Sequence, residues 1–324
     1  MSTGRFGKLS REGSQLLQTA MANLDRLTRL ANAVEEQPRA LTSSLSAEQV
    51  RLVRLQYALP QAIDQQEIYL VYQPIVCVRT DAIVGFEALA RWRHPTYGEI
   101  SPTVFIPLAE ENGLIHSLGK QVITSACRQL SQWRRAFPQQ PSLSVSVNLS
   151  VFQLGQLDLA DHLEQVLDTS QIEPQRLKLE ITESALIENS KVVEIVLQKL
   201  RNLGVQLHLD DFGVGYSALS RLPSLPLDAL KIDRSFVANG NWEICEVIRL
   251  LTDKLGLNVI VEGVETPTEL EILQSLGFQH MQGYFFSRPL PAAAATALLA
   301  NACASSPQRP TLPGGMSAEI ALAS

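Results

Sequence analysis

Cysteine is scarce in this chain, and no two cysteines stand at the close spacing of a metal-binding or redox pair. The four cysteines are Cys77, Cys127, Cys245 and Cys303. Their wide separation disfavours a disulfide framework and fits buried thiols in a reducing compartment. The five histidines form neither an HExxH nor an HxH pattern, which disfavours a zinc site of imidazole and thiolate ligands. A metal ion in this protein would therefore have oxygen ligands.

Long apolar runs and basic clusters are also missing. No segment approaches the roughly 20 apolar residues that a membrane helix needs, and the opening MSTGRFGKLSREGSQ lacks the apolar core of a signal peptide. The 27 lysines and arginines are outnumbered by 33 aspartates and glutamates, which gives a formal charge of −6. This balance argues against a broad binding face for DNA or RNA. We expect a cytoplasmic protein without its own membrane anchor.

Residues 1–55 are predicted to form an amphipathic helix followed by a linker. Two heptad positions are apolar over residues 16–34, with Leu17, Leu24 and Ala31 at one and Ala20, Leu27 and Val34 at the other. This length is the lower limit for a coiled coil, so a helix packed on the main domain and a short dimerising coiled coil both remain open. At the other end, residues 305–324 are rich in Ser, Pro and Gly and are expected to be disordered.

Strand-like and helix-like patterns alternate over residues 56–304. Eight short runs have the β-branched or aromatic content of strands, and they begin at residues 68, 82, 143, 177, 205, 229, 258 and 280. Amphipathic helical patterns lie between most of them, and several end in glycine. Eight such units over about 240 residues predict an α/β protein with a TIM-like (β/α)8 barrel. An open doubly wound sheet is the alternative, but no GxGxxG follows the first strand to support a dinucleotide version.

Seven of the eight predicted strands carry a polar or charged residue near their carboxyl end: Glu87, Asn148, Glu180, Asp210, Lys231, Glu262 and Gln282. A TIM barrel gathers such strand ends on one rim, where its active site lies. Each residue alone also fits a structural role, such as an Asx turn or a solvated strand end. Four carboxylates together, however, would repel one another unless cations neutralised them. Carboxylates with an amide oxygen suit Mg²⁺ or Mn²⁺, with Ca²⁺ as a competitor.

The segment LHLDDFGVGYS at 207–217 places two aspartates side by side at a strand end. Successive strand residues point to opposite faces, but beyond the strand end Asp211 can turn back toward the side of Asp210. Asp210 could then bridge two cations about 3.5 to 4 Å apart, as in enzymes that cleave phosphate esters. Gly213 and Gly215 allow the tight loop that this arrangement needs.

Nine motifs in order resemble those of the EAL-domain cyclic di-GMP phosphodiesterases of bacteria. They are YQPIV at 72–76, EALARW at 87–92, FIPLAEENGLI at 105–115, VNLS at 147–150, LEITES at 179–184, DDFGVGYS at 210–217, LKID at 230–233, EGVET at 262–266 and QGYFFSRPL at 282–290. The resemblance covers about residues 55–300. It implies a TIM-like barrel whose first strand runs antiparallel to the others.

The resemblance also implies two divalent cations, Mg²⁺ or Mn²⁺, with Ca²⁺ inhibitory. The ligands it assigns to one cation are Glu87, Asn148, Glu180 and Asp210, and those to the second are Asp210, Asp211 and Glu262. Lys231, which acts beside Glu262, would orient or deprotonate the attacking water. The remaining matches are Gln73, Arg91 and Gln282 around substrate or water, and Glu183 as the anchor of the loop after the fifth strand. The planar donor fork of Arg91 suits a phosphate.

The reaction implied is hydrolysis of cyclic di-GMP to linear pGpG, with a homodimer and a partner protein bound through the N-terminal helix as expected associations. Two residues depart from the family pattern. Val214 replaces the usual threonine in the loop that Glu183 organises, and Val261 replaces an alanine, which we interpret as a packing change. Two alternatives stay open: a catalytically weak receptor that holds cyclic di-GMP and signals through its N-terminal helix, and a metal-dependent lyase that uses Lys231 as its base.

Overall fold

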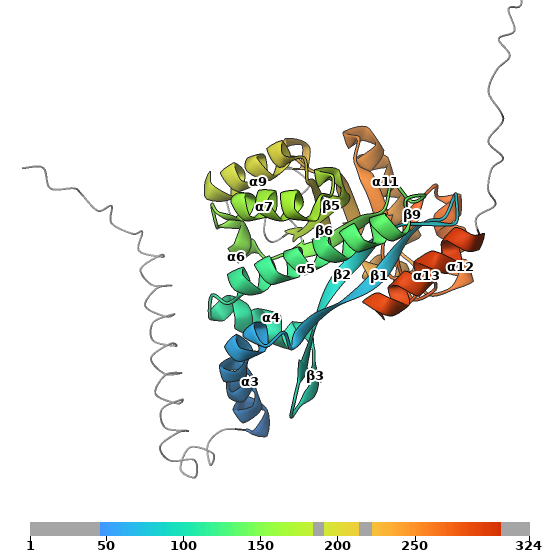
Figure 1. Cartoon of the computed structure of the whole chain (residues 1–324). Coiled ribbons are helices and arrows are strands. Elements are labelled where there is room, and N and C mark those ends of the chain that lie inside the picture. The colour runs from blue at the N-terminus through green and yellow to red at the C-terminus, as the bar shows by residue number, and fades with distance from the viewer. Residues whose placement is uncertain (1–45, 184–190, 214–221, 306–324) are drawn as a thin grey trace, which may run out of the picture.

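The protein is described by a computed structural model that covers residues 46–183, 191–213 and 222–305 (Figure 1). The amphipathic helix predicted within residues 16–34, residues 306–324 of the predicted tail and Val214 lie outside these ranges, whereas Ser305 is the last residue of a helix. The predictions made for them therefore remain predictions. No helix within the described ranges is long and apolar enough to cross a membrane.

Eight strands close into a barrel, as the sequence pattern predicts. They are β1 (Ile68–Cys77), β2 (Ala82–His94), β4 (Ser144–Leu149), β5 (Leu177–Thr182), β6 (Gln206–Phe212), β7 (Ala229–Ile232), β8 (Asn258–Val261) and β9 (His280–Met281). From β2 through β9 each neighbouring pair of these strands is parallel. β1 pairs with both β2 and β9 and runs antiparallel to each, which closes the ring and excludes the open sheet.

Helices surround the barrel at the places where the amphipathic patterns fall. The predicted helices are α5 (Ile115–Ala136), α7 (Leu159–Ser170), α9 (Lys191–Leu203), α11 (Trp242–Leu255) and α12 (Pro267–Ser275). Their apolar faces and the outward faces of the strands form the main hydrophobic core. Val261 is fully buried in this core, in agreement with a packing role.

Several elements were not predicted from the sequence. They are the helices α3 (Ala47–Asp64), α4 (Pro102–Glu111), α6 (Val151–Leu154), α10 (Arg234–Ala238) and α13 (Ala292–Ser305), the 3-10 turns η1 (Pro174–Arg176) and η2 (Leu222–Ser224), and the short strands β3 (Gly98–Ile100) and β10 (Leu290–Pro291). Helix α3 begins with a capping box between Ser46 and Gln49 and crosses residue 55, where the sequence suggests that the barrel domain begins. That domain boundary remains a prediction.

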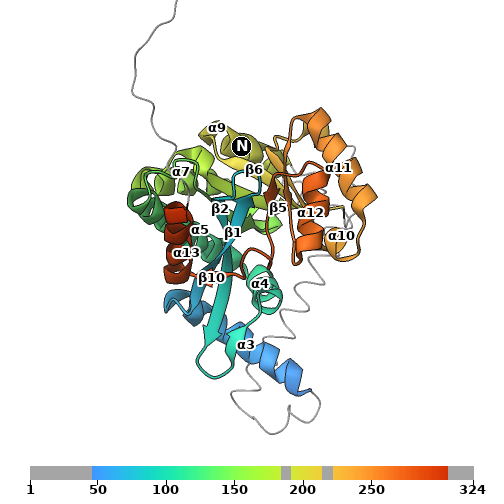
Figure 2. The ribbon, with the colours of Figure 1, turned by 90° about the vertical axis from the view of Figure 1, so that its right-hand side faces the viewer.

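A second hydrophobic core lies beside the barrel, where β1 and β2 project beyond it. Leu59 of α3, Trp92 of β2, Phe105 of α4 and Leu118 of α5 are almost completely buried together. The rings of Trp92 and Phe105 meet edge to face with centroids 6.0 Å apart. Figures 1 and 2 show α3 and α4 side by side at this end of the molecule. We call the elements around this second core, namely α3, α4, β3 and the adjoining ends of β1 and β2, the side lobe.

Candidate active site

Lys231 of β7 lies at the centre of an acidic cluster and is only 1% exposed. Its Nζ is 2.6 Å from Glu262 Oε1, 2.7 Å from Glu180 Oε2, 3.2 Å from Asp210 Oδ1 and 3.5 Å from Glu87 Oε2. The four carboxylates stand on or directly after β8, β5, β6 and β2. The barrel therefore brings these strand-end residues together on one rim, as the sequence pattern predicts.

Two side-chain amides hold Glu87 in place. Asn148 Nδ2 donates to its Oε1 at 2.8 Å, and Gln282 Nε2 donates to its Oε2 at 2.6 Å. Gln282 Nε2 also lies 3.0 Å from Gln73 Oε1, while Gln73 Nε2 donates to the main-chain oxygen of Ser287 at 3.1 Å. Because Asn148 uses its amide nitrogen for Glu87, its oxygen is left for another partner.

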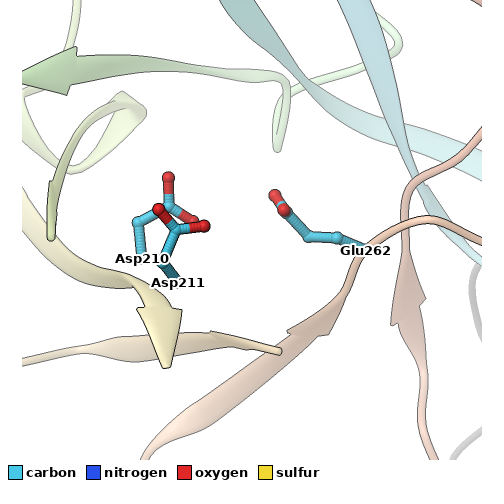
Figure 3. Close-up of side chains that lie close together, drawn as sticks. All are labelled: Asp210, Asp211 and Glu262. Atoms are coloured by element: carbon cyan, nitrogen blue, oxygen red, sulfur yellow. The ribbon is translucent and has the colours of Figure 1, made fainter. Parts of the chain in front are cut away.

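Asp211 turns back to the same side as Asp210. Strand β6 loses its regular register with β7 between Leu209 and Phe212, and Asp211 has a left-handed backbone with φ of 54°. This conformation is one that Asp adopts more readily than most residues. One oxygen each from Asp210, Asp211 and Glu262 consequently lie within 4.8 Å of one another. In Figure 3 the two aspartates from β6 and the glutamate that follows β8 point toward each other.

The cluster carries more negative charge than its lysine can balance. Burial raises the pKa of Glu180 well above its usual value even though Lys231 opposes the change, and burial raises the pKa of Glu262 to about 8. Burial and the neighbouring Asp210 raise the pKa of Asp211. For Lys231, burial favours the neutral form, but the carboxylates outweigh it and hold its pKa well above the ordinary value. The lysine is therefore a hydrogen-bond donor.

The donor set fits a hard divalent cation. Glu180 Oε1 is buried and accepts no hydrogen bond, although leaving such an atom unsatisfied is costly. Asp210 Oδ1 likewise accepts no hydrogen bond, although Lys231 Nζ lies 3.2 Å from it. The remaining donors are carboxylate and amide oxygens, with no thiolate or imidazole among the contacts described above. Oxygen-only sites of this kind are typical of Mg²⁺, Mn²⁺ and Ca²⁺.

A comparison with protein families identifies the chain. The family model for the EAL domain matches residues 56–289. This chain belongs to the EAL domain family. The family resemblance of the nine motifs is thereby confirmed, as is the antiparallel first strand that it implies.

Relatives of known name share this EAL domain. Over 240 residues the chain is 44% identical to the "Oxygen sensor protein DosP" of Escherichia coli (strain K12), covering 72% of this chain and 30% of DosP. Over 247 residues it is 42% identical to the "Cyclic di-GMP phosphodiesterase NbdA" of Pseudomonas aeruginosa, covering 75% of this chain and 31% of NbdA. The chain thus spans about a third of the length of these curated relatives.

Solved structures of EAL domains superpose on the barrel. The chain is 37% identical to the PaMucR phosphodiesterase in its c-di-GMP complex, with a TM-score of 0.70 and coverage of 75% of this chain and 99% of that one. It is 29% identical to the EAL enzyme Bd1971 in its cAMP- and cyclic-di-GMP-bound form, with a TM-score of 0.75 and coverage of 89% and 79%.

The structure also places two further predicted residues, Arg91 and Glu183. Arg91 of β2 is half-buried, and its Nη1 donates to the main-chain oxygen of Ala90 at 2.8 Å. Glu183 is buried directly after β5. The loops that Glu183 is expected to connect, residues 184–190 and 214–221, lie outside the described residues. The roles of Arg91 in substrate binding and of Glu183 in loop anchoring therefore remain predictions.

Sequence reasoning missed two residues next to this site. Ser150 Oγ donates to Glu110 Oε1 at 2.6 Å, although the residues are 40 positions apart. Both stand in motifs that resemble the family, FIPLAEENGLI and VNLS. Ser150 is the last residue of the run predicted as a strand from residue 143, but only Asn148 of that run is predicted as a site residue. The available signal was Ser150 followed three residues later by Gln153, which is the pattern of a helix capping box.

Proposed function

We propose that this EAL domain is a cyclic di-GMP phosphodiesterase that hydrolyses one phosphodiester bond to give linear pGpG. The observation that carries the proposal is the position of Lys231, within 3.5 Å of carboxylates from four different strands. The names of NbdA as a cyclic di-GMP phosphodiesterase and of the PaMucR complex with c-di-GMP support the choice of substrate.

The proposed enzyme requires two divalent cations, Mg²⁺ or Mn²⁺. Glu87, Asn148, Glu180 and Asp210 would hold one, and Asp210, Asp211 and Glu262 would hold the other. Such cations lower the pKa of a water molecule, neutralise phosphate charge and stabilise the leaving oxygen. Ca²⁺ would bind the same oxygens, but its larger and less regular coordination shell would make it an inhibitor.

The protein side chains bind and orient the reactants in this proposal. Lys231, whose Nζ lies among the carboxylates, would orient or deprotonate the attacking water. Gln73 and Gln282 would keep Glu87 in its ligand position through the hydrogen bonds that they make. Arg91 would bind a phosphate of the substrate through its planar donor fork.

The decisive experiment is chromatography of cyclic di-GMP after incubation with the protein and Mg²⁺ or Mn²⁺, with EDTA as the control. Lys231→Met is the test variant, and Lys199→Met, an exposed residue of α9, is the matched control. We expect pGpG only with the cation, and a loss of about 10²-fold or more in Lys231→Met. Saturable binding of cyclic di-GMP without formation of pGpG would instead identify the protein as a receptor for the dinucleotide. No response to the dinucleotide at all would favour the lyase.

The associations expected from the sequence belong to the same proposal. A homodimer, a partner protein bound through residues 1–55 and a cytoplasmic location would place the enzyme under the control of other proteins. Light scattering of the full chain at several concentrations tests the homodimer directly.

A further inference from the structure

A hydrogen bond between side chains connects helix α4 of the side lobe to the segment that follows β4 at the active site. Glu110 stands in the last turn of α4, and its Oε1 accepts from Ser150 Oγ at 2.6 Å. Ser150 follows Asn148 by two residues, directly after β4 ends. Glu110 therefore accepts a hydrogen bond from a residue that lies two positions along the chain from Asn148, a proposed cation ligand.

The segment around Ser150 is held firmly on its other sides. Ser150 caps α6, and its backbone N–H donates to Gln153 Oε1 at 3.1 Å. Gln153 is buried and packs against Gly119 of α5 so closely that a Cβ atom at Gly119 would lie 1.8 Å from Gln153 Nε2. Because these contacts fix the segment against α5, the bond to Glu110 determines its position relative to α4.

Helix α4 is in turn held by α3. Gln56 Nε2 of α3 donates to Asn112 Oδ1 at 3.0 Å, and Asn112 is the residue that caps the carboxyl end of α4. The side chain of Asn112 also donates to the main-chain oxygen of Leu108 at 2.8 Å. The end of α4 that carries Glu110 is therefore fixed on both sides, by α3 and by Ser150.

We propose that Glu110 is a positioning residue for the cation site. Through Ser150 it fixes the end of β4, and so keeps Asn148 in the orientation in which its Nδ2 donates to Glu87 Oε1. Hydrogen-bond partners just outside a metal site commonly determine how well its ligands are oriented. This inference rests on the cation site of the proposed function, and it adds a residue that makes no contact with cation or substrate.

The test compares Glu110→Ala with Glu110→Gln, and uses Glu111→Ala as the matched control on the same helix. Glu111 is exposed. The first readout is the Mg²⁺ or Mn²⁺ concentration that gives half of the maximal rise in melting temperature, which does not depend on turnover. The second is the cation concentration that gives half-maximal hydrolysis of cyclic di-GMP.

We expect Glu110→Ala to raise both half-saturating concentrations about tenfold, with activity largely restored at high cation concentration. Glu110→Gln keeps an oxygen that can accept from Ser150, so it should remain within about twofold of the unmodified chain. Glu111→Ala should change neither value. A Glu110→Ala variant with a lower melting temperature but unchanged cation dependence would overturn the inference, since Glu110 would then be merely structural.

Two other outcomes separate this inference from the proposed function. If Glu110→Gln raised the half-saturating cation concentrations as much as Glu110→Ala, the negative charge of Glu110 rather than its hydrogen bond would be responsible. Positioning through Ser150 would then be rejected. A cation-dependent rise in melting temperature without formation of pGpG would overturn the proposed phosphodiesterase activity. The role of Glu110 in cation binding would still be tested by the melting temperatures of its variants. The absence of any cation effect in the unmodified chain would overturn both.

Discussion

At the scale of single residues, the two adjacent aspartates show how an electrostatically unfavourable arrangement indicates a cation site. Asp210 and Asp211 share one side only because the backbone of Asp211 is left-handed, with φ of 54°. Asp210 is buried and Asp211 is exposed, and two like charges this close are unfavourable unless a cation joins them. The sequence allowed the pair to be predicted as ligands because the second aspartate falls beyond the regular strand. The register shift that permits the turn depends on β7, and no local pattern shows it.

Replacing Asp211 by Asn tests the charge of this residue without changing its shape. Asn also tolerates a left-handed backbone, so the fold should be kept. We expect cation-dependent hydrolysis to fall about 100-fold or more, because one ligand of the second cation loses its charge. Asp81→Asn is the matched control, since Asp81 has nearly the same φ, 53°, in an exposed turn. Equal activity of the two variants would remove Asp211 from the ligand set.

Cation binding should become tighter as the pH rises toward 8. Burial raises the pKa of Glu262 to about 8, so below that pH a proton competes with the cation for this carboxylate. The folded pKa lies above the unfolded one, so without cations this group contributes stability at low pH that is lost as the pH rises toward 8. We expect the half-saturating Mg²⁺ concentration, measured by melting temperature, to fall between pH 6 and 8 and then level off.

The same titration with Glu262→Gln provides the control for this pH effect. Gln cannot ionise, so the part of the pH dependence that belongs to Glu262 should disappear. An unchanged slope in that variant would assign the proton to another carboxylate of the cluster. A flat profile in the unmodified chain would contradict the competition itself.

At the scale of elements, the predicted helices have an amphipathic pattern without an internal proline, whereas two of the helices that were not predicted have a proline inside. α5, α7, α9, α11 and α12 lie where the sequence shows amphipathic helical patterns between predicted strands. α3 and α4 carry Pro60 and Pro107 inside the helix, and proline is normally a reason to end a helix. Their amino-terminal caps, Ser46 and Ser101, were the signals that could have identified them.

Replacing Gly119 by Ala should disturb α6 as well as α5, in which it lies. The added Cβ atom would overlap Gln153, whose side chain is buried and completes the capping box of α6. We expect a loss of about 1 to 3 kcal/mol in the free energy of unfolding, from overpacking and a weakened cap. Urea denaturation measures the change. Ser125→Ala, also on α5, should stay within about 0.5 kcal/mol, and a similar loss there would show that α5 is sensitive throughout.

At the scale of the whole molecule, the barrel could be predicted but the side lobe could not. The barrel follows from a repeated local pattern, because each strand and helix shows its own periodicity. The side lobe joins Leu59, Trp92, Phe105 and Leu118, which come from four separate elements and share no periodic pattern. The active site shows the same difference. The carboxylates could be predicted from their positions at strand ends, but the hydrogen bonds of Glu87 to Asn148 and Gln282 depend on how the strands are arranged in the barrel.

The rates at which two buried cysteines react with a thiol reagent should show that the barrel unfolds as one unit. Cys127 of α5 and Cys245 of α11 lie in the main core under different helices of the barrel, and neither is exposed. Burial raises the pKa of Cys127 to about 12 and that of Cys245 to about 11, so both thiols are unreactive while they stay buried. We expect a thiol reagent at pH 8 to modify both only through transient unfolding, at similar rates.

Saturating Mg²⁺ should slow the modification of both cysteines by the same factor. A cation that binds only the folded barrel lowers the population of every state in which the carboxylate cluster has come apart. The measurement is the modification rate of each cysteine by peptide mass spectrometry, in a Cys303→Ser background that removes the half-buried thiol of α13. If Cys127 were protected by Mg²⁺ and Cys245 were not, α11 would open independently, and the barrel would contain at least two units of different stability.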